Sequence, residues 1–405
     1  MKIAIVCNDT RGGVQPYLAL GLGLKRAGHN VLAVAPSEFT PMFAQNGIPI
    51  TPLSGGDEVA RLRTVGIEEK GTLATLRFMR EHLPHRIADW TLETLDACNG
   101  VDVITGGIGG MVTGLSVADR LGVPFISTQL QPIGVRTNAY PGVLTPWFPT
   151  WLGSAATRFS HTLSDQAAWM PFRSAMMKAR KSALGLSGQS RATNGQPVLY
   201  GFSRYVLSAP SDCDKGKNVT GYWNMPTRNW QPPAELDDFM AQGNTIVSFG
   251  FGSMAGQKPE ELTEIVKTAI HKLGIRGIMI TGSGMLANTQ TSDQLYCINS
   301  IPHDWLFPRV HAVVHHGGAG TTGAALQAGV PSVIVPFAVD QPFWAGRVEA
   351  LGVGGKSISR RKLNVDNLVA SLQQALGDIK IQQAAQRLGE KIRTENGVAN
   401  AVSFF

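Results

Sequence analysis

Short apolar, β-branched stretches alternate with helix-like stretches along the first half of the chain. The stretch at 2–7 is followed by a loop with two glycines, predicted over residues 8–15, and then by a helical pattern that stops at Gly28. Further strand-like stretches lie at 31–35, 48–53, 101–105 and 124–130. Continuous apolar strands separated by helices are typical of parallel sheets that are covered by helices on both faces.

The same alternation returns in the second half, at 245–250, 276–281, 311–316 and 331–337, and the pattern is helical from 364 onward. We therefore predict an α/β protein with two Rossmann-like, doubly wound domains that face a cleft. The predicted parts are an N-terminal domain (1–210), a polar and proline-rich interdomain linker (211–240), a C-terminal domain (241–385) and a C-terminal helix that packs back on the N-terminal domain (386–405). Open sheets of this kind bind ligands at the carboxyl ends of their strands.

The segment 140–185 departs from this regularity because it concentrates prolines and aromatic residues. They are Pro141, Pro146, Trp147, Phe148, Pro149, Trp151, Trp169 and Phe172. Such a segment favours an apolar small-molecule site, with Trp147, Phe148 and Trp169 as candidate acceptor contacts. A lid over an ordinary core is an equally good interpretation.

Charge and length narrow the classes of function. The chain has 405 residues and a net charge of +7, and residues 1–205 hold 19 basic against 13 acidic groups. No Lys/Arg run exceeds the three residues of 360–362, so a dedicated nucleic-acid binder is not expected, whereas peripheral membrane contact through the basic N-terminal half is possible. No apolar stretch is long enough to span a bilayer and the N-terminus begins a strand pattern, so we expect a cytoplasmic protein.

The sharpest local pattern is the stretch 311–329, in which a strand, a glycine-rich turn and a helix follow one another. Glycines let the backbone approach a ligand, and the free N–H groups at a helix start suit a phosphate. We therefore predict diphosphate binding at Gly318, Gly320 and Thr321.

A second interpretation of the same turn remains open. Gly318 to Gly323 is also a GxGxxG string, and Asp340 follows Gly320 by 20 residues, as in dinucleotide-binding domains. An NAD(P)-dependent oxidoreductase is therefore an alternative. Against it, the turn does not follow the first strand of its domain, and the paired histidines before it are not part of that pattern.

The residues of 301–348 resemble the donor-binding signature of GT-B, UDP-sugar-dependent glycosyltransferases, especially the sterol glucosyltransferase and bacterial natural-product branch. The stretches 10–29, 169–173 and 248–254 are also similar to that branch. The resemblance implies that His316 and the glycine turn bind the diphosphate, that Asp340 and Gln341 hydrogen-bond the sugar, and that no metal or cofactor is needed. The full implied donor set is Gly12, Ser253, Ile301, His303, His316, Gly318, Gly320, Thr321, Asp340 and Gln341.

The resemblance also exposes a missing residue. Relatives commonly carry an aspartate, the proposed catalytic base, where this chain has Gly13. Asp9 is the nearest carboxylate and is our candidate base. A solvated or loop-capping Asp9, an acceptor that needs little base assistance and a base elsewhere in the N-terminal domain are the alternatives.

The leading hypothesis is an inverting enzyme that moves a hexose, with glucose favoured, from a UDP-sugar to a hydroxyl of a sterol, terpenoid or polyketide-like acceptor. A catalytically weak nucleotide-sugar-binding protein is the other alternative, motivated by Gly13. Three histidines near the motif (His311, His315 and His316) are not expected to form a metal site, because neighbouring strand residues point to opposite faces. The DxD string at 212–214 is attributed to chance.

Overall fold

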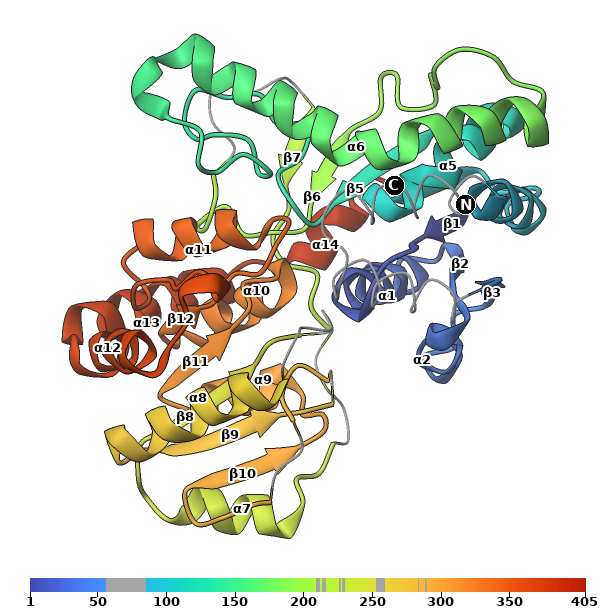
Figure 1. Cartoon of the computed structure of the whole chain (residues 1–405). Helices are drawn as coiled ribbons and strands as arrows, with labels where there is room; N and C mark the ends of the chain where they lie inside the picture. The colour runs from blue at the N-terminus through green and yellow to red at the C-terminus, as the bar shows by residue number, and fades with distance from the viewer. Residues whose placement is uncertain are drawn as a thin grey trace. The chain divides into compact units, whose positions relative to one another are not determined.

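Figure 1 shows the computed structural model of the chain. It describes residues 1–55, 85–208, 212, 216–225, 227, 230–252, 259–282, 284–287 and 290–405. The chain divides into two compact units. Unit 1 comprises Met1–Met225 together with Asn396–Phe405, and unit 2 comprises Pro226–Glu395.

Unit 1 contains a seven-stranded sheet, entirely parallel, in the order β3-β2-β1-β4-β5-β6-β7. The strands are β1 (Lys2–Val6), β2 (Asn30–Pro36), β3 (Ile50–Leu53), β4 (Val103–Gly106), β5 (Phe125–Gln129), β6 (Val198–Tyr200) and β7 (Lys217–Val219). The helices with described bounds are α1 (Arg11–Arg26), α2 (Thr40–Gln45), α5 (Ile108–Leu121), α6 (Ser154–Leu184) and α14 (Gly397–Val402), with 3₁₀ turns η1 (Ser37–Phe39) and η2 (Thr150–Leu152). Residues 85–97 are also helical.

The central strand β1 is buried on both faces. Ile3 and Ile5 belong to a core shared with α1, whereas Ala4 and Val6 belong to a second core shared with α5 and α6. Successive strand residues point to opposite faces, so this split means that helices cover both sides of the sheet. The doubly wound arrangement predicted from the apolar runs is confirmed.

Unit 2 repeats the plan with a five-stranded parallel sheet in the order β10-β9-β8-β11-β12. The strands are β8 (Ile246–Gly250), β9 (Arg276–Ile280), β10 (Leu295–Ile298), β11 (Ala312–His315) and β12 (Ser332–Ile334). Its helices are α7 (Ala234–Ala241), α8 (Pro259–Leu273), α9 (His303–Leu306), α10 (Ala319–Ala328), α11 (Gln341–Ala350), α12 (Val365–Gly377) and α13 (Ile379–Arg393), with η3 (Phe307–Arg309) and η4 (Arg360–Lys362). Val247 and Ile246 again face separate cores.

Two local predictions need correction. Residues 8–15 were expected to form a loop, but α1 begins at Arg11, so Gly12 and Gly13 lie in its first turn. The segment 211–240, expected as a linker, contains β7 in the sheet of unit 1 and α7 in unit 2. The turn and proline residues of these segments favour irregular backbone only locally, and packing against a sheet overrides that preference.

The last ten residues return to unit 1, where α14 packs against α1 (Figure 1). A Cβ on Gly23 of α1 would meet the side chain of Val398, and Ala401 is fully buried in the core of unit 1. The Asn400 amide donates a hydrogen bond to the carbonyl oxygen of Thr220 at 2.9 Å. The end of the chain is therefore part of the core of unit 1.

Candidate functional site

The sheet of unit 2 changes its winding direction between β8 and β11. The chain runs from β8 outward to β9 and β10, and then returns to place β11 on the other side of β8. Loops that follow neighbouring parallel strands leave the sheet at the same edge, and such a switch point opens a crevice for ligands. The loop after β11 carries His316 and the glycine turn, and the segment after β12 leads to Asp340 and Gln341 at the start of α11.

The glycine turn ends in an open helix start. Gly318 is the N-cap of α10 and offers no side-chain oxygen, so no side chain caps the helix. The first intrahelical bond runs from the N–H of Thr322 to the carbonyl of Gly318 at 2.9 Å. The N–H groups of residues 319–321 precede that bond and have no partner within the helix. Together with the helix dipole they suit an anion.

The imidazole of His316 lies between two glycines. A Cβ on Gly252, after β8, would be 2.5 Å from Cε1 of His316, and a Cβ on Gly318 would also collide with the ring. Gly252 further has φ of +72°, a conformation that favours glycine. The loops after β8 and β11 therefore meet at this ring. The sequence pattern pointed to Gly318 but not to Gly252 as part of this arrangement.

Burial keeps the two histidines neutral. It lowers the pKa of His316 to about 4, with a further contribution from the charge of His303, and it lowers the pKa of His315 well below its ordinary value. Nδ1 of His315 accepts a hydrogen bond from the N–H of Gly317 at 3.1 Å, so this side chain supports the turn. Nδ1 of His316 is buried without a partner among the described residues. The imidazole of His316 can therefore form a further hydrogen bond through Nδ1.

Asp340 and Gln341 are buried at the start of α11. Oδ2 of Asp340 accepts a hydrogen bond from the Trp344 indole at 3.0 Å. Oε1 of Gln341 accepts from the N–H groups of Phe337 and Ala338, at 2.7 and 3.2 Å. Val339, which directly precedes Asp340, has φ of 59°, which is rare for a β-branched side chain. Backbone strain of this kind clusters at binding sites, where surrounding contacts maintain it.

The other predicted donor residues are distributed as follows. Ile301 is buried before α9, and His303 at the start of α9 stacks on the ring of Phe307, with ring centroids 4.4 Å apart. Gly12 lies in α1 of unit 1. Ser253 lies outside the described residues. Their roles toward a donor stay predictions.

Unit 1 has its own switch point, between β1 and β4. The end of β4, the N-cap Gly107 and the first residues of α5 form a second glycine-rich turn, 106–110, which the sequence analysis did not single out. A Cβ on Gly109 would collide with the carbonyl oxygen of Asn8, and one on Gly106 with that of Val6. Only glycines allow the turn to approach the end of β1 this closely. The loop that carries Asp9 is therefore fixed against the start of α5.

The carboxylate of Asp9 lies directly beside Gly13. A Cβ built on Gly13 would overlap Cγ and Oδ2 of Asp9, so the carboxylate occupies the space where a side chain at position 13 would begin. Oδ1 of Asp9 accepts a hydrogen bond from the N–H of Thr10 at 2.6 Å. Burial raises the pKa of the Cys7 thiol and of the Tyr17 phenol, and the nearby charge of Asp9 adds to both shifts. Asp9 is itself partly exposed.

The candidate acceptor aromatics lie before and within α6. Trp147 is 74% exposed, whereas Phe148 and Trp169 are half-buried. Trp147 and Phe148 contact each other, with ring centroids 6.2 Å apart. Trp169 is separated from this pair by about four turns of helix, since α6 begins at Ser154.

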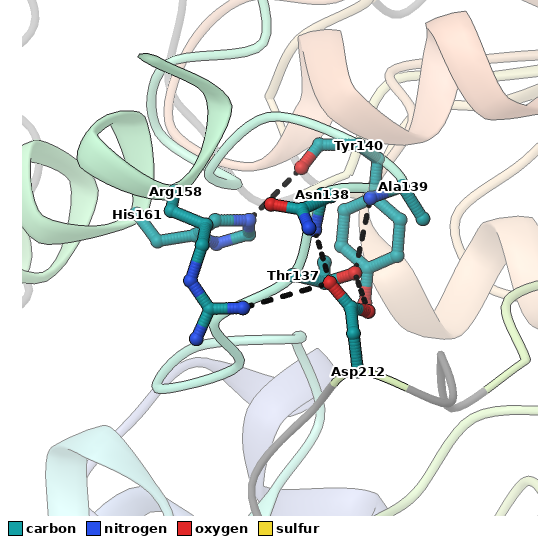
Figure 2. A network of polar contacts seen from close by, with 7 residues as sticks. All are labelled: Thr137, Asn138, Ala139, Tyr140, Arg158, His161 and Asp212. Carbon is teal, nitrogen blue, oxygen red and sulfur yellow. Dashed lines mark hydrogen bonds and ion pairs between the residues drawn. The ribbon is translucent and has the colours of Figure 1, made fainter. Parts of the chain in front are cut away.

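Asp212, whose DxD string was attributed to chance, fixes the loop that leads to these aromatics (Figure 2). Its carboxylate accepts hydrogen bonds from the Thr137 hydroxyl and from the N–H of Asn138, both at 2.7 Å, and it lies 3.6 Å from the Arg158 guanidinium. These hydrogen bonds lower the pKa of the Asp212 carboxyl. A residue that sequence reasoning set aside is thus a structural anchor.

Helix α6 holds the next part of the same loop. Nε2 of His161 lies 2.9 Å from the carbonyl oxygen of Tyr140, as Figure 2 shows. The N–H groups of Gly142 and Leu144 donate to serine hydroxyls of α6, at 2.9 and 3.0 Å. The loop and the first half of α6 therefore form one packed structure.

Among the residues that the structure describes, no cluster of three or more His, Cys, Asp or Glu side chains is suited to a metal ion. Within the same part of the chain, no helix combines the length and the apolar character that a membrane crossing requires.

Comparisons with known proteins bear on the whole chain. Residues 288–400 match the family described as Erythromycin biosynthesis protein CIII-like, C-terminal domain. The chain is 34% identical over 416 residues to a sterol 3-beta-glucosyltransferase of Pichia angusta, and 35% identical over 428 residues to one of Neurospora crassa. Each alignment covers 99% of this chain but only 33% and 27% of those proteins, so the chain spans about a third of their length or less.

A crystal structure of the glycosyltransferase VinC in complex with dTDP aligns with a TM-score of 0.69 at 17% identity, covering 100% of this chain and 98% of VinC. Likeness at that identity concerns the fold, and it extends over both units. Residues 288–400 are therefore similar to the EryCIII-like C-terminal domain, the chain as a whole has the GT-B glycosyltransferase fold, and sterol 3-beta-glucosyltransferases are similar to it over nearly all of its length.

Proposed function

We propose that this chain transfers a sugar from a nucleotide diphosphate sugar to a hydroxyl of a lipophilic acceptor. The observation that carries the proposal is its similarity, over 99% of its length, to sterol 3-beta-glucosyltransferases. The glycine turn of unit 2 agrees with it, because this turn follows the fourth strand of its unit rather than the first. That position disfavours the nicotinamide alternative.

Unit 2 binds the donor in this proposal. The open N–H groups at the start of α10 and the His316 imidazole receive the diphosphate, and Asp340 and Gln341 bind hydroxyls of a hexose, with glucose favoured. A neutral histidine can donate one hydrogen bond to a phosphoryl oxygen. These uncharged donors stabilise the negative charge that develops on the leaving diphosphate, so the proposal needs no resident metal or cofactor. Ile301 and His303 then lie at the base and ribose, with uridine favoured.

Unit 1 binds the acceptor and supplies the base. Asp9 takes the proton of the acceptor hydroxyl while the oxygen of that hydroxyl forms a bond to the anomeric carbon. The bond from the anomeric carbon to the diphosphate oxygen breaks at the same time. Attack from the face opposite the leaving group inverts the anomeric centre. Trp147, Phe148 and Trp169 provide apolar contacts for the acceptor. The excess of basic groups in residues 1–205 further suits peripheral contact with an anionic membrane.

The test is product formation with purified protein, a panel of lipophilic alcohols that includes a sterol, and UDP-glucose or TDP-glucose as donor. A β-glycoside product with one donor supports the proposal. Thermal shift with UDP, TDP and NAD is measured in parallel, since a ligand at 100 times its dissociation constant adds about 2.7 kcal/mol of stability. Stabilisation by a nucleoside diphosphate without product would favour the weak binding protein, and stabilisation by NAD alone would contradict the proposal.

A further inference from the structure

Exposed apolar side chains gather in one part of unit 1. The described residues include twelve large hydrophobic side chains that are exposed, and six of them lie within residues 147–177. Trp151, in the 3₁₀ turn before α6, is 82% exposed, and its neighbour Leu152 is also exposed. A concentration of this kind on a water-soluble surface marks an interaction site.

The apolar residues of α6 itself share one face. Phe159, Met170 and Met177 are exposed, and at 100° per residue their directions agree within roughly 20°. The opposite face of α6 packs into the core, where Ala175 and Ala179 belong to the same cluster as residues of α5. Packing against the core therefore does not account for the apolar residues on the outer face of α6.

The exposed charged residues of the second half of α6 are all basic; Arg173 and Lys181 lie within roughly 40° of the apolar row, and Lys178 lies at its flank, roughly 100° away. Arg173, Lys178 and Lys181 are exposed, and none forms an ion pair with the part of the chain that the structure describes. The single acidic residue of α6, Asp165, accepts a hydrogen bond from the N–H of Gly134 at 3.1 Å, and burial raises its pKa. The other basic residue at this end of the helix, Arg180, is neutralised by Asp119 at 2.7 Å.

We propose that this outer face of α6, with Trp151 and Leu152 of the preceding turn, docks on an anionic lipid surface. Tryptophan and phenylalanine prefer the headgroup region, where an apolar ring and a polar surrounding coexist. Arginine and lysine beside them complement anionic lipid. A protein partner would leave three unpaired cations to be matched by specific acids, whereas an anionic bilayer matches them by composition. The docking rests on the proposed function in one respect, since it gives the peripheral membrane contact of unit 1 a defined surface. Vesicle binding is measured without any sugar transfer, so a failure of the docking and a failure of the transfer activity are distinguishable. Docking would bring unit 1 to the place where lipophilic alcohols reside.

The test is co-sedimentation of the whole protein with phosphatidylcholine vesicles, with and without phosphatidylserine. The apolar variant is Trp151→Ser, Phe159→Ser and Met170→Ser. Its matched control removes three exposed apolar residues elsewhere, Leu92→Ser, Tyr205→Ser and Ile379→Ser. We expect the apolar variant to lose at least about tenfold in vesicle affinity and the control to bind as the wild type does.

A charge variant separates lipid charge from apolar insertion. Arg173→Glu, Lys178→Glu and Lys181→Glu should lower affinity for phosphatidylserine vesicles by about tenfold or more, while Lys356→Glu, Arg361→Glu and Lys362→Glu in unit 2 should not. Activity toward a water-soluble acceptor should stay unchanged in all four variants. Wild-type protein that co-sediments with neither vesicle type would overturn the proposal. A wild-type dimer that the apolar variant converts to a monomer in analytical ultracentrifugation would assign the face to a second copy instead.

Discussion

At the scale of single residues, Asp9 and Gly13 form a complementary pair. The carboxylate of Asp9 fills the space above the Cα of Gly13, four residues later in the sequence, so each position constrains the other. A chain with aspartate at position 13 and a small residue at position 9 would place a carboxylate in nearly the same region. We therefore propose that the Asp9 carboxylate can stand in for an aspartate at position 13.

We expect Asp9→Asn to lower kcat by about 10²- to 10⁴-fold, the usual contribution of a general base, with little change in UDP affinity. Gly13→Asp alone should also lower kcat, because the new side chain displaces Asp9. The double variant Asp9→Gly, Gly13→Asp should recover a large part of the activity. Steady-state kinetics with product detection measure all three. A double variant no better than Asp9→Gly alone would show that the two positions are not interchangeable.

His316 predicts a pH dependence of stability. Its pKa in the folded state is about 4, below the ordinary 6.5, so the unfolded chain binds more protons between these values. The free energy of unfolding should therefore rise with pH from 4 to 6.5. Replacing His316 by Gln should reduce that rise by about 1–3 kcal/mol in urea titrations, whereas His271→Asn, at an exposed site, should leave it intact. An unchanged slope in the His316 variant would mean that the histidine is not held neutral.

At the scale of elements, the loop before α6 depends on one close approach. A Cβ on Gly142 would be 2.5 Å from Cβ of Ser164 and 2.6 Å from the carbonyl oxygen of Ser160, and backbone cannot yield as a flexible side chain does. The Asp212 anchor and the serine hydroxyls hold the loop on either side of this point. The geometry of the candidate acceptor aromatics rests on this contact.

Gly142→Ala should therefore destabilise unit 1 by about 1–3 kcal/mol, the usual cost of overpacking. Gly377→Ala, where nothing lies within 4 Å of the added carbon, is the matched control and should be neutral or slightly stabilising. Chemical denaturation followed by tryptophan fluorescence measures both. Equal stability of the two variants would contradict the packing described for the loop.

The elements also show where sequence patterns suffice. The long apolar strands were predicted because burial on both faces leaves a continuous signal, and all nine of them occur. The strands β6, β7 and β10 were not predicted, and pairing with a neighbouring strand is what makes these short segments strands. The first turn of α1 was missed for a related reason, since its two glycines have low helix propensity and tertiary contacts hold them.

The candidate site divides in the same way. The glycine turn at 317–320 was predicted, because a strand, glycines and a helix in that order are local in sequence. Contacts between loops were not: Gly252 beside His316 and the turn 106–110 against Asn8 arise only when parallel strands are adjacent. Sequence gives the residues of such a site, and sheet order decides which of them meet.

At the scale of the whole molecule, the chain crosses from unit 1 to unit 2 and then returns. Removal of residues 396–405 should uncover the face of α1 that packs on α14 and destabilise unit 1 by roughly 2–5 kcal/mol, although the removed residues follow unit 2 in sequence. Binding of UDP, which we propose for unit 2, should persist. Thermal unfolding with limited proteolysis locates the loss. Destabilisation confined to unit 2 would contradict this assignment.

The return of the chain has a consequence for how such proteins can be rebuilt. The backbone of Gly221 and Tyr222, shortly before the chain passes from unit 1 into unit 2, lies against Gly397, which follows the return of the chain to unit 1. Unit 2 is thus inserted into the chain of unit 1 at a single point, between Met225 and Asn396. A short peptide that joins residue 225 to residue 396 would make unit 1 a continuous chain. A different domain whose two ends lie close together could replace unit 2 at the same junction without disrupting the core of unit 1.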